Sequence, residues 1–472
     1  MKTHNIAVIG GGGAGAVAAW MLGKSNKVTL FEASDYLGGH AYSYPVETEA
    51  GTRYVDMGVE YFNERLSPNV CALLEHFGIE SYVAPLTMHV EFPGEGRFWN
   101  NMTGKGDLAA ELRQEFDQFH LDMAAVLSSG DERYKKMSIG QYLDERGYSD
   151  AFRYQALVPL MTVYSGCNAP SLDYTLMYVA ISFNMNLLSF FSPGYWRKAK
   201  GGMSAYLKCI AHELGDRIKL GTQVDRVIPS PAGVTVEFNG KSRCFDHVIF
   251  ATHADTTLSM LVTTDRLYQD ILGGFEHVPV KSYLHHDGHW VSPQGDGHYC
   301  QFRMPDAFGS GSLKTQYGTL TRVNNVLPPY QGVDKPLLVT FDPKAAIKPE
   351  YIVCKKAWKL PKLRPADFRR KTRIREIQGV NNLWFCGTDT SLTGHEGAIV
   401  SAMVVADRLG AAYPYRNNTL ACVQFKVVKD IMGVNTPGET VVSWMGDAIF
   451  RVARTLSLHK EQSHKFIKDL IV

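Results

Sequence analysis

The chain has 472 residues, of which 45% are hydrophobic and 20% are charged, and its formal net charge is +2. This length exceeds one ordinary core and predicts two domains or one elaborated pair. The near-neutral charge gives no support for a nucleic-acid partner. Eight scattered cysteines without a C-x-x-C pair argue for a reducing compartment and against a disulfide framework or a metal site. Because the N-terminus passes directly into a strand-like run, we expect no signal peptide and a cytoplasmic protein.

The first 32 residues follow the order strand, glycine turn, helix, strand and acid. Asn5–Ile9 and Val28–Phe31 are short apolar runs, Ala16–Leu22 is a helical stretch of small residues, and Glu32 ends the second run. The turn before the helix comprises Gly10, Gly11, Gly12, Gly13, Ala14 and Gly15. This is the order of a dinucleotide-binding βαβ unit.

Three glycines of this turn are expected to have separate roles. Gly10 permits the tight turn, Gly12 lets the backbone approach a diphosphate, and Gly15 lets the helix and strand pack closely. The diphosphate would rest on free N–H groups at the helix N-terminus, where the helix dipole favours negative charge. Glu32 is placed to accept hydrogen bonds from a ribose.

Helical patterns dominate the next part of the chain. Ser67-Pro68 predicts a helix start, and Leu108–Leu127 and Ile139–Arg146 read as further helices. Leu172–Phe191 is largely apolar but contains an aspartate, two asparagines and several serines. It is therefore expected to be a buried helix of a second domain rather than a membrane span.

Strand-like runs return after a helix that opens at Gly201-Gly202-Met203. Predicted strands include Val224–Ile228, Val280–His285 and the final run Asn382–Cys386. This last run leads into the turn Gly387-Thr388-Asp389 and a helix expected from about residue 397 to 409.

These motifs together resemble the flavin amine oxidase and phytoene-desaturase-like superfamily. The match rests on the glycine turn with Glu32, on Gly38-Gly39, on Gly201-Gly202-Met203 and on FCGTDTSLTGHEGAIVSA, and it covers residues 5 to about 410. It implies an α/β fold in which a Rossmann-like FAD-binding domain is interleaved with an α+β substrate domain. The expected FAD-binding domain comprises residues 1–85, 200–270 and 376–412, the substrate domain 86–199 and 271–375, and a C-terminal helical extension 413–472.

The resemblance also implies which residues bind FAD. Besides the glycine turn and Glu32, the implied positions are Ala33, Gly38, Gly39, His40, Gly58, Val224 (through its backbone), Gly387, Thr388, Asp389, Glu396, Gly397 and Ala398. Two positions depart from the amine oxidase pattern. His40 stands where many amine oxidases have arginine, and His395 stands where they place an aromatic residue over the flavin. The aromatic cage of an amine oxidase is therefore incomplete.

Two side chains are candidates for catalysis. Lys281 resembles by position the amine oxidase lysine that holds a water near flavin N5, and the alternative is a surface lysine on an edge strand. His395 precedes a helix that faces the flavin in relatives and could transfer a proton, unless it is a capping histidine. The segment His285–His289 suggests a metal site, but a solvated strand-turn explains it better because neighbouring strand residues point to opposite faces.

The leading interpretation is a FAD-dependent oxidoreductase. It would oxidise, desaturate or isomerise a largely apolar small molecule, such as an acyl lipid or isoprenoid, by hydride transfer to flavin N5. The alternatives are an amine or amino-acid oxidase that uses O₂ and a non-catalytic flavoprotein partner. An apolar helical stripe in the extension, from Val441 to Leu456, predicts packing on the body, self-association or contact with a membrane surface.

Overall fold

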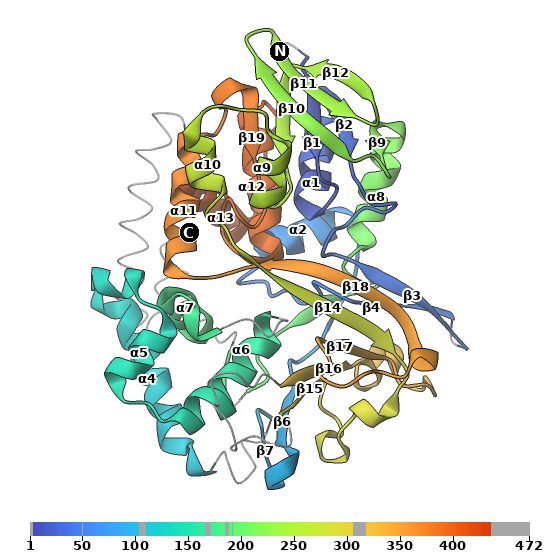
Figure 1. Cartoon of the computed structure of the whole chain (residues 1–472). Coiled ribbons are helices and arrows are strands. Elements are labelled where there is room, and N and C mark those ends of the chain that lie inside the picture. The colour runs from blue at the N-terminus through green and yellow to red at the C-terminus, as the bar shows by residue number, and fades with distance from the viewer. Residues whose placement is uncertain are drawn as a thin grey trace.

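The computed structural model describes residues 3–49, 51–102, 110–165, 171–184, 188–190, 192–304 and 318–435. Its elements gather into two bodies, one above the other in Figure 1. We call them the parallel-sheet body, at the top, and the mixed-sheet body, at the bottom. None of the helices in these residue ranges has the length and apolar character that a bilayer span requires.

The parallel-sheet body is built on one five-stranded sheet with the order β19-β13-β1-β2-β9. These strands are β1 (Asn5–Ile9), β2 (Lys27–Phe31), β9 (Ile218–Lys219), β13 (His247–Phe250) and β19 (Leu383–Phe385). All neighbouring pairs are parallel, and β1 lies in the middle of the sheet. Neighbouring parallel strands must be joined by long crossover connections. In this protein, the segments that connect strands of the parallel sheet form the mixed-sheet body.

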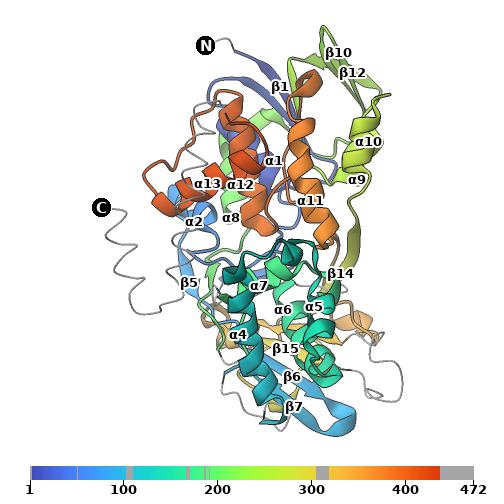
Figure 2. The same cartoon turned by 90° about the vertical axis from the view of Figure 1, so that its left-hand side faces the viewer.

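Helices cover this sheet (Figures 1 and 2). They are α1 (Gly13–Leu22), α2 (Pro68–His76), α8 (Ala205–Leu214), α9 (Ala254–Met260), α10 (Arg266–Leu272), α11 (Pro365–Arg373), α12 (Gly394–Arg408) and α13 (Thr419–Ile431). A small antiparallel sheet lies beside them, formed by β10 (Val224–Ser230), β11 (Gly233–Phe238) and β12 (Lys241–Phe245). Parallel strands covered by helices are the α/β arrangement that the sequence predicts.

The mixed-sheet body contains a seven-stranded sheet with the order β18-β14-β17-β16-β15-β6-β7. Its strands are β6 (Met88–Phe92), β7 (Arg97–Asn100), β14 (His277–His285), β15 (Cys300–Arg303), β16 (Thr319–Val323), β17 (Leu338–Phe341) and β18 (Ile352–Pro361). Four helices flank it: α4 (Arg113–Ser129), α5 (Ile139–Arg146), α6 (Val158–Ser165) and α7 (Leu176–Asn184). Buried aromatic side chains fill the space between these helices and the sheet, with the Phe116 and Phe190 rings stacked 4.2 Å apart.

Two short antiparallel pairs connect the bodies. They are β3 (Ser43–Thr48) with β4 (Gly51–Asp56), and β5 (Ser81–Val83) with β8 (Arg197–Ala199). The long strands β14 and β18 are paired from His277 to His285 and extend from one body into the other (Figure 1). The division into domains from the sequence stays a prediction, but these pairs show how closely the two bodies are joined.

The start of α12 differs from expectation. The sequence predicts a helix from about residue 397, whereas α12 begins at Gly394, which has a φ of +78°. A positive φ is easily reached by glycine, so the chain turns sharply there and enters the helix three residues early. As a result, His395 and Glu396 lie in the first turn of α12.

Glu396 joins α12 to α2. Its carboxylate accepts hydrogen bonds from the backbone N–H groups of Asn69 and Val70, at 2.9 and 2.8 Å, and from the Asn69 side chain at 2.9 Å. Ser67, at the N-cap of α2, makes no side-chain capping bond. Glu396 therefore satisfies the free N–H groups of α2 from another helix.

The first helix of the C-terminal extension packs against the body. α13 buries Ala421, Phe425 and Val428 and lies against α12 and α2. The apolar stripe predicted from residue 441 to 456 lies outside the described residues. Its predicted contact with the body, a second subunit or a membrane surface therefore stays a prediction.

We predict that Glu396→Ala destabilises the protein by about 3 kcal/mol, because it leaves the buried backbone N–H groups of Asn69 and Val70 without an acceptor. Urea unfolding followed by circular dichroism measures this change. Glu75→Ala is the matched control, because Glu75 is an exposed residue of the same helix α2. Equal stabilities of the two variants would show that Glu396 does not hold α2.

Candidate cofactor and substrate site

The glycine turn after β1 has the geometry of a close helix–strand contact. Gly10 has a φ of +101°, and its N–H donates to the Phe31 carbonyl at 2.8 Å. A Cβ on Gly15 would lie 1.8 Å from the Gly10 carbonyl oxygen, so only glycine fits there. A Cβ on Gly12 would meet nothing within 4 Å. The turn therefore leaves open space beside Gly12, at the N-terminus of α1.

Glu32 closes the same turn from the end of β2. Its two carboxylate oxygens accept hydrogen bonds from the backbone N–H groups of Gly11, at 2.5 Å, and Ser34, at 2.7 Å. The carboxylate is thus held at the carboxyl edge of the sheet, which is where ligands bind in open α/β folds. Ala33, the next residue, is exposed at this edge.

The loop after β2 returns to the glycine turn. The Gly38 N–H donates to the Gly11 carbonyl at 2.9 Å, and a Cβ on Gly39 would lie 3.3 Å from the Gly12 Cα. Gly58 packs on the carbonyl of His40, where a Cβ would lie 2.3 Å from that oxygen. Four of the residues implied by the family resemblance, Gly38, Gly39, His40 and Gly58, therefore meet beside Gly12.

A third turn, Gly387-Thr388-Asp389, follows β19 at the same edge of the parallel sheet. Gly387 has a φ of +118°, and a Cβ there would meet nothing within 4 Å. The buried Lys371 donates to the Thr388 carbonyl at 2.6 Å. Asp389 Oδ2 accepts hydrogen bonds from the Ala254 N–H at 2.9 Å and from His277 Nε2 at 3.0 Å.

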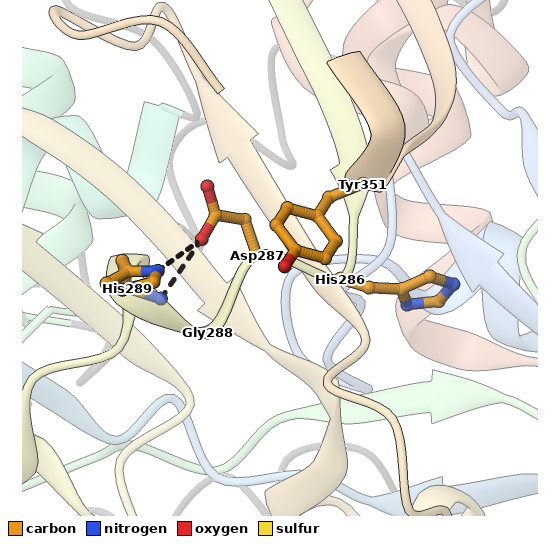
Figure 3. A pocket seen from close by; sticks show the side chains of 5 residues that line it. All are labelled: His286, Asp287, Gly288, His289 and Tyr351. Atoms are coloured by element: carbon orange, nitrogen blue, oxygen red, sulfur yellow. Dashed lines mark hydrogen bonds and ion pairs between the residues drawn. The ribbon is translucent and has the colours of Figure 1, made fainter. Parts of the chain in front are cut away.

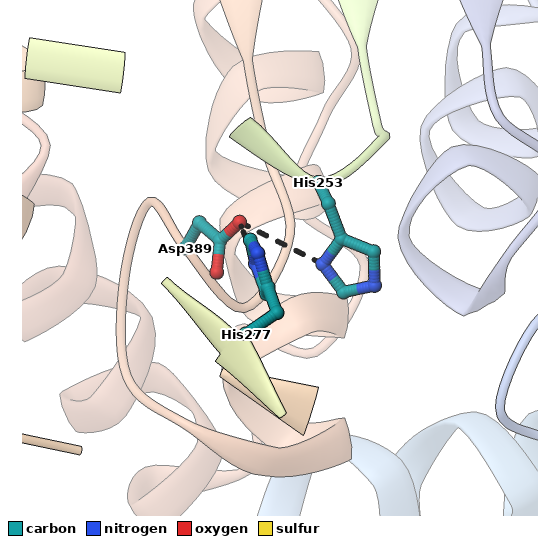
Figure 4. Close-up of side chains that lie close together, drawn as sticks. All are labelled: His253, His277 and Asp389. Carbon is teal, nitrogen blue, oxygen red and sulfur yellow. Dashed lines mark hydrogen bonds and ion pairs between the residues drawn. The ribbon is translucent and has the colours of Figure 1, made fainter. Parts of the chain in front are cut away.

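His253 and His277 surround Asp389, as Figure 4 shows. His253 Nδ1 lies 3.7 Å from Asp389 Oδ2. Burial alone would raise the pKa of Asp389, but the two histidines lower it well below its ordinary value, while Asp389 raises the pKa of His277. Because their ligand atoms all lie within 4.8 Å of one another, this group has the composition of a cation site. Hydrogen bonding explains the same contacts without an ion.

His40 does not replace the charge of the missing arginine. Burial and the neighbouring His253 lower its pKa to about 3, so the imidazole is neutral at physiological pH. Its ring lies 5.8 Å from that of His253 and 5.3 Å from that of Trp358. His40 therefore contributes packing and hydrogen-bonding capacity, but no positive charge, to a bound phosphate.

His395 lies in the first turn of α12, beside α1 and α8. Its Nε2 lies 3.1 Å from the Tyr206 hydroxyl, and its Cε1 would lie 2.8 Å from a Cβ on Gly13. Burial lowers the pKa of His395 to about 4. The imidazole therefore packs at the start of α1, whereas the preceding Gly394 is exposed and has open space around its Cα.

Lys281 lies on β14, and its role at the flavin stays a prediction. Its side chain is exposed on β14, whereas the alternate residues Val280 and Ser282 are buried. The inward Ser282 hydroxyl accepts a hydrogen bond of 2.8 Å from Trp358 Nε1. The alternation of a strand thus places Lys281 on the outer face.

The remaining predicted cofactor residues lie in the elements around these turns, and their part in binding FAD stays a prediction. Val224 is buried at the start of β10, and Gly397 has no space for a side chain, because a Cβ would lie 1.8 Å from the Leu392 carbonyl oxygen. Ala398 is half-buried in α12, and Glu396 is committed to α2. Gly13 and Ala14 form the first turn of α1.

Sequence reasoning missed a buried ion cluster behind Gly58. Glu60 accepts from Lys198 Nζ at 2.8 Å and lies 2.9 Å from Arg322 Nε, and Arg322 also donates to the Gly58 carbonyl at 3.3 Å. Asp56 lies 3.9 Å from Lys198, and burial raises the pKa of Asp56 to about 6. Burial alone would lower the pKa of Lys198, but Glu60 outweighs this effect and the pKa is raised. Two cations and two carboxylates therefore compensate one another.

A row of aromatic side chains begins beside this cluster, where Lys198 Nζ lies 5.6 Å from the centroid of the Tyr61 ring. We call its four members, Tyr61, Trp196, Tyr164 and Tyr178, the aromatic row. Consecutive ring centroids are 5.8, 6.0 and 6.0 Å apart. Tyr61 follows the Gly58 turn, and at the other end Tyr178 is hydrogen-bonded to Thr393, which precedes Gly394. The row therefore runs from the Gly58 turn to the start of α12, and its four rings pack in the core of the mixed-sheet body.

The histidines at the far end of β14 form a separate, shallow pocket of about 310 Å³ (Figure 3). His289 Nδ1 lies 2.9 Å from Asp287 Oδ1, and His286 Nδ1 lies 2.6 Å from the Pro336 carbonyl. In Figure 3, His286 and His289 point away from each other. Within the described ranges, these histidines are not part of any group with metal-ligand spacing.

The fold and its turns define a dinucleotide-binding α/β protein. Gly12, Gly387 and Gly394 each have open space where a side chain would stand, and the Gly12 and Gly387 turns follow parallel strands of one sheet, at the carboxyl edge where a dinucleotide can bind. Glu32 is available for the ribose. The residues present therefore fit FAD.

Comparison with known families identifies the protein more closely. Residues 14–349 match the family described as flavin containing amine oxidoreductase. The chain therefore belongs to this family of flavin-containing proteins.

Relatives with a described activity are distant. The flavin-containing amine oxidase of Oncorhynchus mykiss is 28% identical over 282 residues, covering 55% of this chain and 52% of the relative. Amine oxidase B of Homo sapiens is 26% identical over 255 residues, covering 49% and 47%. The chain spans about half the length of the curated relatives it matches.

Solved structures share the fold at low identity. Cyclohexylamine oxidase from Brevibacterium oxydans IH-35A has a TM-score of 0.63 at 16% identity, covering 86% of this chain and 100% of that one. The CLA-producing fatty acid isomerase from P. acnes has a TM-score of 0.59 at 14% identity, covering 86% and 97%. These likenesses show that the FAD-dependent amine oxidase fold is correct for this chain.

We predict that Gly12→Val gives a folded protein without FAD, because the side chain occupies the open space beside the glycine turn. Gly15→Val should instead prevent folding, since it places atoms on the Gly10 carbonyl. Visible absorbance measures bound flavin, and circular dichroism measures folding. Yellow Gly12→Val protein would contradict this placement of the diphosphate.

Proposed function

We propose that this oxidoreductase acts at carbon on a largely apolar substrate, by oxidation, desaturation or double-bond isomerisation. FAD, when bound, supplies the hydride acceptor at flavin N5. The observation that carries the proposal is the aromatic row between Gly58 and Gly394, whose neighbouring charges are already paired. Such a row supplies apolar surface with a few fixed polar groups, as small-molecule sites commonly do.

The charges near the row favour a substrate without a positive charge. Glu60 is paired with Lys198 and Arg322, and Asp56 lies beside Lys198. An ammonium group would therefore meet no uncompensated carboxylate in this cluster and would lie near two buried cations. Desolvating a charge without a partner is costly, so this arrangement opposes a protonated amine.

The protein residues have positioning roles in this proposal. Arg322 holds the Gly58 carbonyl, and Glu60 fixes Arg322, so the turn beside the cofactor is rigid. Gly394 leaves room where a side chain would stand, and the neutral His395 supports Tyr206 and the glycine turn rather than transferring a proton. We further propose that the turns at Gly12, Gly39 and Gly387 hold the diphosphate.

Amine oxidation is the second candidate function, because amine oxidases are prominent among the relatives and solved neighbours. It would require a neutral amine beside the flavin and a side chain that assists the reaction with O₂. The side chain of Lys281 is exposed on the face of β14 opposite to the buried Ser282. A fatty acid isomerase of the same fold supports chemistry at carbon as an alternative.

We predict that anaerobic mixing with unsaturated fatty acids or polyenes bleaches the flavin absorbance or yields isomerised product, and that primary amines do neither. Chromatography of the products separates isomerisation, which leaves the flavin oxidised, from desaturation. Rapid bleaching by amines alone would establish the second candidate instead.

A companion prediction concerns Lys281→Met. Because the side chain is exposed, we expect flavin reduction and reoxidation by O₂ to remain within about twofold of the unmodified enzyme. Stopped-flow absorbance measures both rates. Lys356→Met, which alters another lysine on the paired strand β18, serves as the control. A selective loss of more than tenfold in reoxidation would restore Lys281 to the amine oxidase role.

A further inference from the structure

Two buried hydrogen-bond donors of the aromatic row have no partner among the described residues. They are the Tyr61 hydroxyl and the Trp196 indole Nε1. By contrast, Tyr164 is hydrogen-bonded to Ser182 and Tyr178, and Tyr178 to Thr393. The unpaired donors are therefore confined to one end of the row, beside the Gly58 turn.

An unpaired buried donor is unusual and costly. Leaving such a group without an acceptor costs roughly 1–3 kcal/mol, and most buried polar atoms of folded proteins are paired. Trp196 is 3% exposed, and its ring lies 5.8 Å from that of Tyr61 in an edge-on arrangement. Two adjacent donors in this state indicate a place where a ligand supplies the acceptor.

The chemistry of the two groups fixes the kind of ligand atom. The tryptophan Nε1 only donates. Burial and the neighbouring Glu60 raise the pKa of Tyr61 well above its usual range, so its hydroxyl keeps its proton. Lys198 and Arg322 also lie near Tyr61, with Lys198 Nζ 5.6 Å from the ring centroid. This environment suits an oxygen acceptor and excludes an ammonium group, which has no lone pair to offer.

We propose that Tyr61 and Trp196 together bind the oxygen of an acyl group, as a carboxylate or an ester carbonyl, at one end of the apolar substrate. This inference rests on the proposed function and narrows it to acyl compounds. The rest of the chain would then extend along Tyr164 and Tyr178 towards Gly394, where the turns of the cofactor site lie.

Binding to the oxidised holoenzyme tests the proposal. Oleate, methyl oleate, oleylamine and an octadecene are titrated separately, and the perturbation of the flavin spectrum reports the Kd. Oleate or methyl oleate should bind most tightly. Tighter binding of oleate would show that the ligand group is a carboxylate, and tighter binding of methyl oleate that it is an ester carbonyl. Tyr61→Phe and Trp196→Phe should each weaken that ligand roughly ten- to hundredfold and leave octadecene binding unchanged.

Controls separate recognition from folding. FAD content and melting temperature should be unchanged in Tyr61→Phe, which removes a single oxygen atom and carries the test alone if Trp196→Phe loses stability. Tyr268→Phe, in another core of the molecule, should bind every ligand as the unmodified enzyme does.

The proposal fails if both variants retain full affinity for oleate and methyl oleate, or if oleylamine binds as tightly as either. The proposed chemistry at carbon would still stand if a fatty acid reduced the flavin or was isomerised. Conversely, tight donor-dependent binding of oleate without any turnover would support this inference and count against chemistry at carbon on that substrate.

Discussion

The contact between Gly10 and Gly15 is the constraint on which the rest of the site depends. It brings α1 so close to β1 that even a methyl group on Gly15 would overlap the Gly10 carbonyl. This closeness fixes the N-terminus of α1 at the carboxyl edge of the sheet. The loop after β2 then meets that N-terminus at Gly38-Gly39, and the turn at Gly387 lies at the same edge of the sheet.

Buried charge maintains the second half of the site. Glu60, Lys198 and Arg322 come from three distant parts of the chain and meet behind the Gly58 turn. Each is costly to bury alone, but together they satisfy one another and hold that turn beside His40. The same compensation leaves Tyr61 and Trp196 as the polar groups of the row that are free to meet a ligand. In our proposal, the same charge cluster thus makes the Gly58 turn rigid and makes the aromatic row selective for its ligand.

The sequence predicted the parallel-sheet body well, because its signals are local. The glycine turn, Glu32 and the Gly387 turn each follow a strand directly, and the structure brings them to one edge. The family, the fold and FAD were predicted correctly from the same motifs. The residue-by-residue assignment of the site stays a prediction.

Side-chain direction was harder to predict. At the start of α12, Gly394 is exposed while His395 packs against Tyr206, and on β14 Lys281 is exposed while Ser282 is buried. The motif alone does not distinguish these neighbours, and the catalytic roles of His395 and Lys281 stay predictions. The clusters around Asp389 and Glu60 had no sequence signal. Asp389 lies more than a hundred residues from His253 and His277, as Glu60 does from Lys198 and Arg322, and these groups meet only in the folded chain.

The paired strands β14 and β18 have a mechanical consequence. One end of this ribbon holds His277 against Asp389 in the parallel-sheet body, and the other end is hydrogen-bonded to β17 in the mixed-sheet body. The ribbon is therefore anchored in both bodies, and any movement of one body relative to the other must twist or bend it.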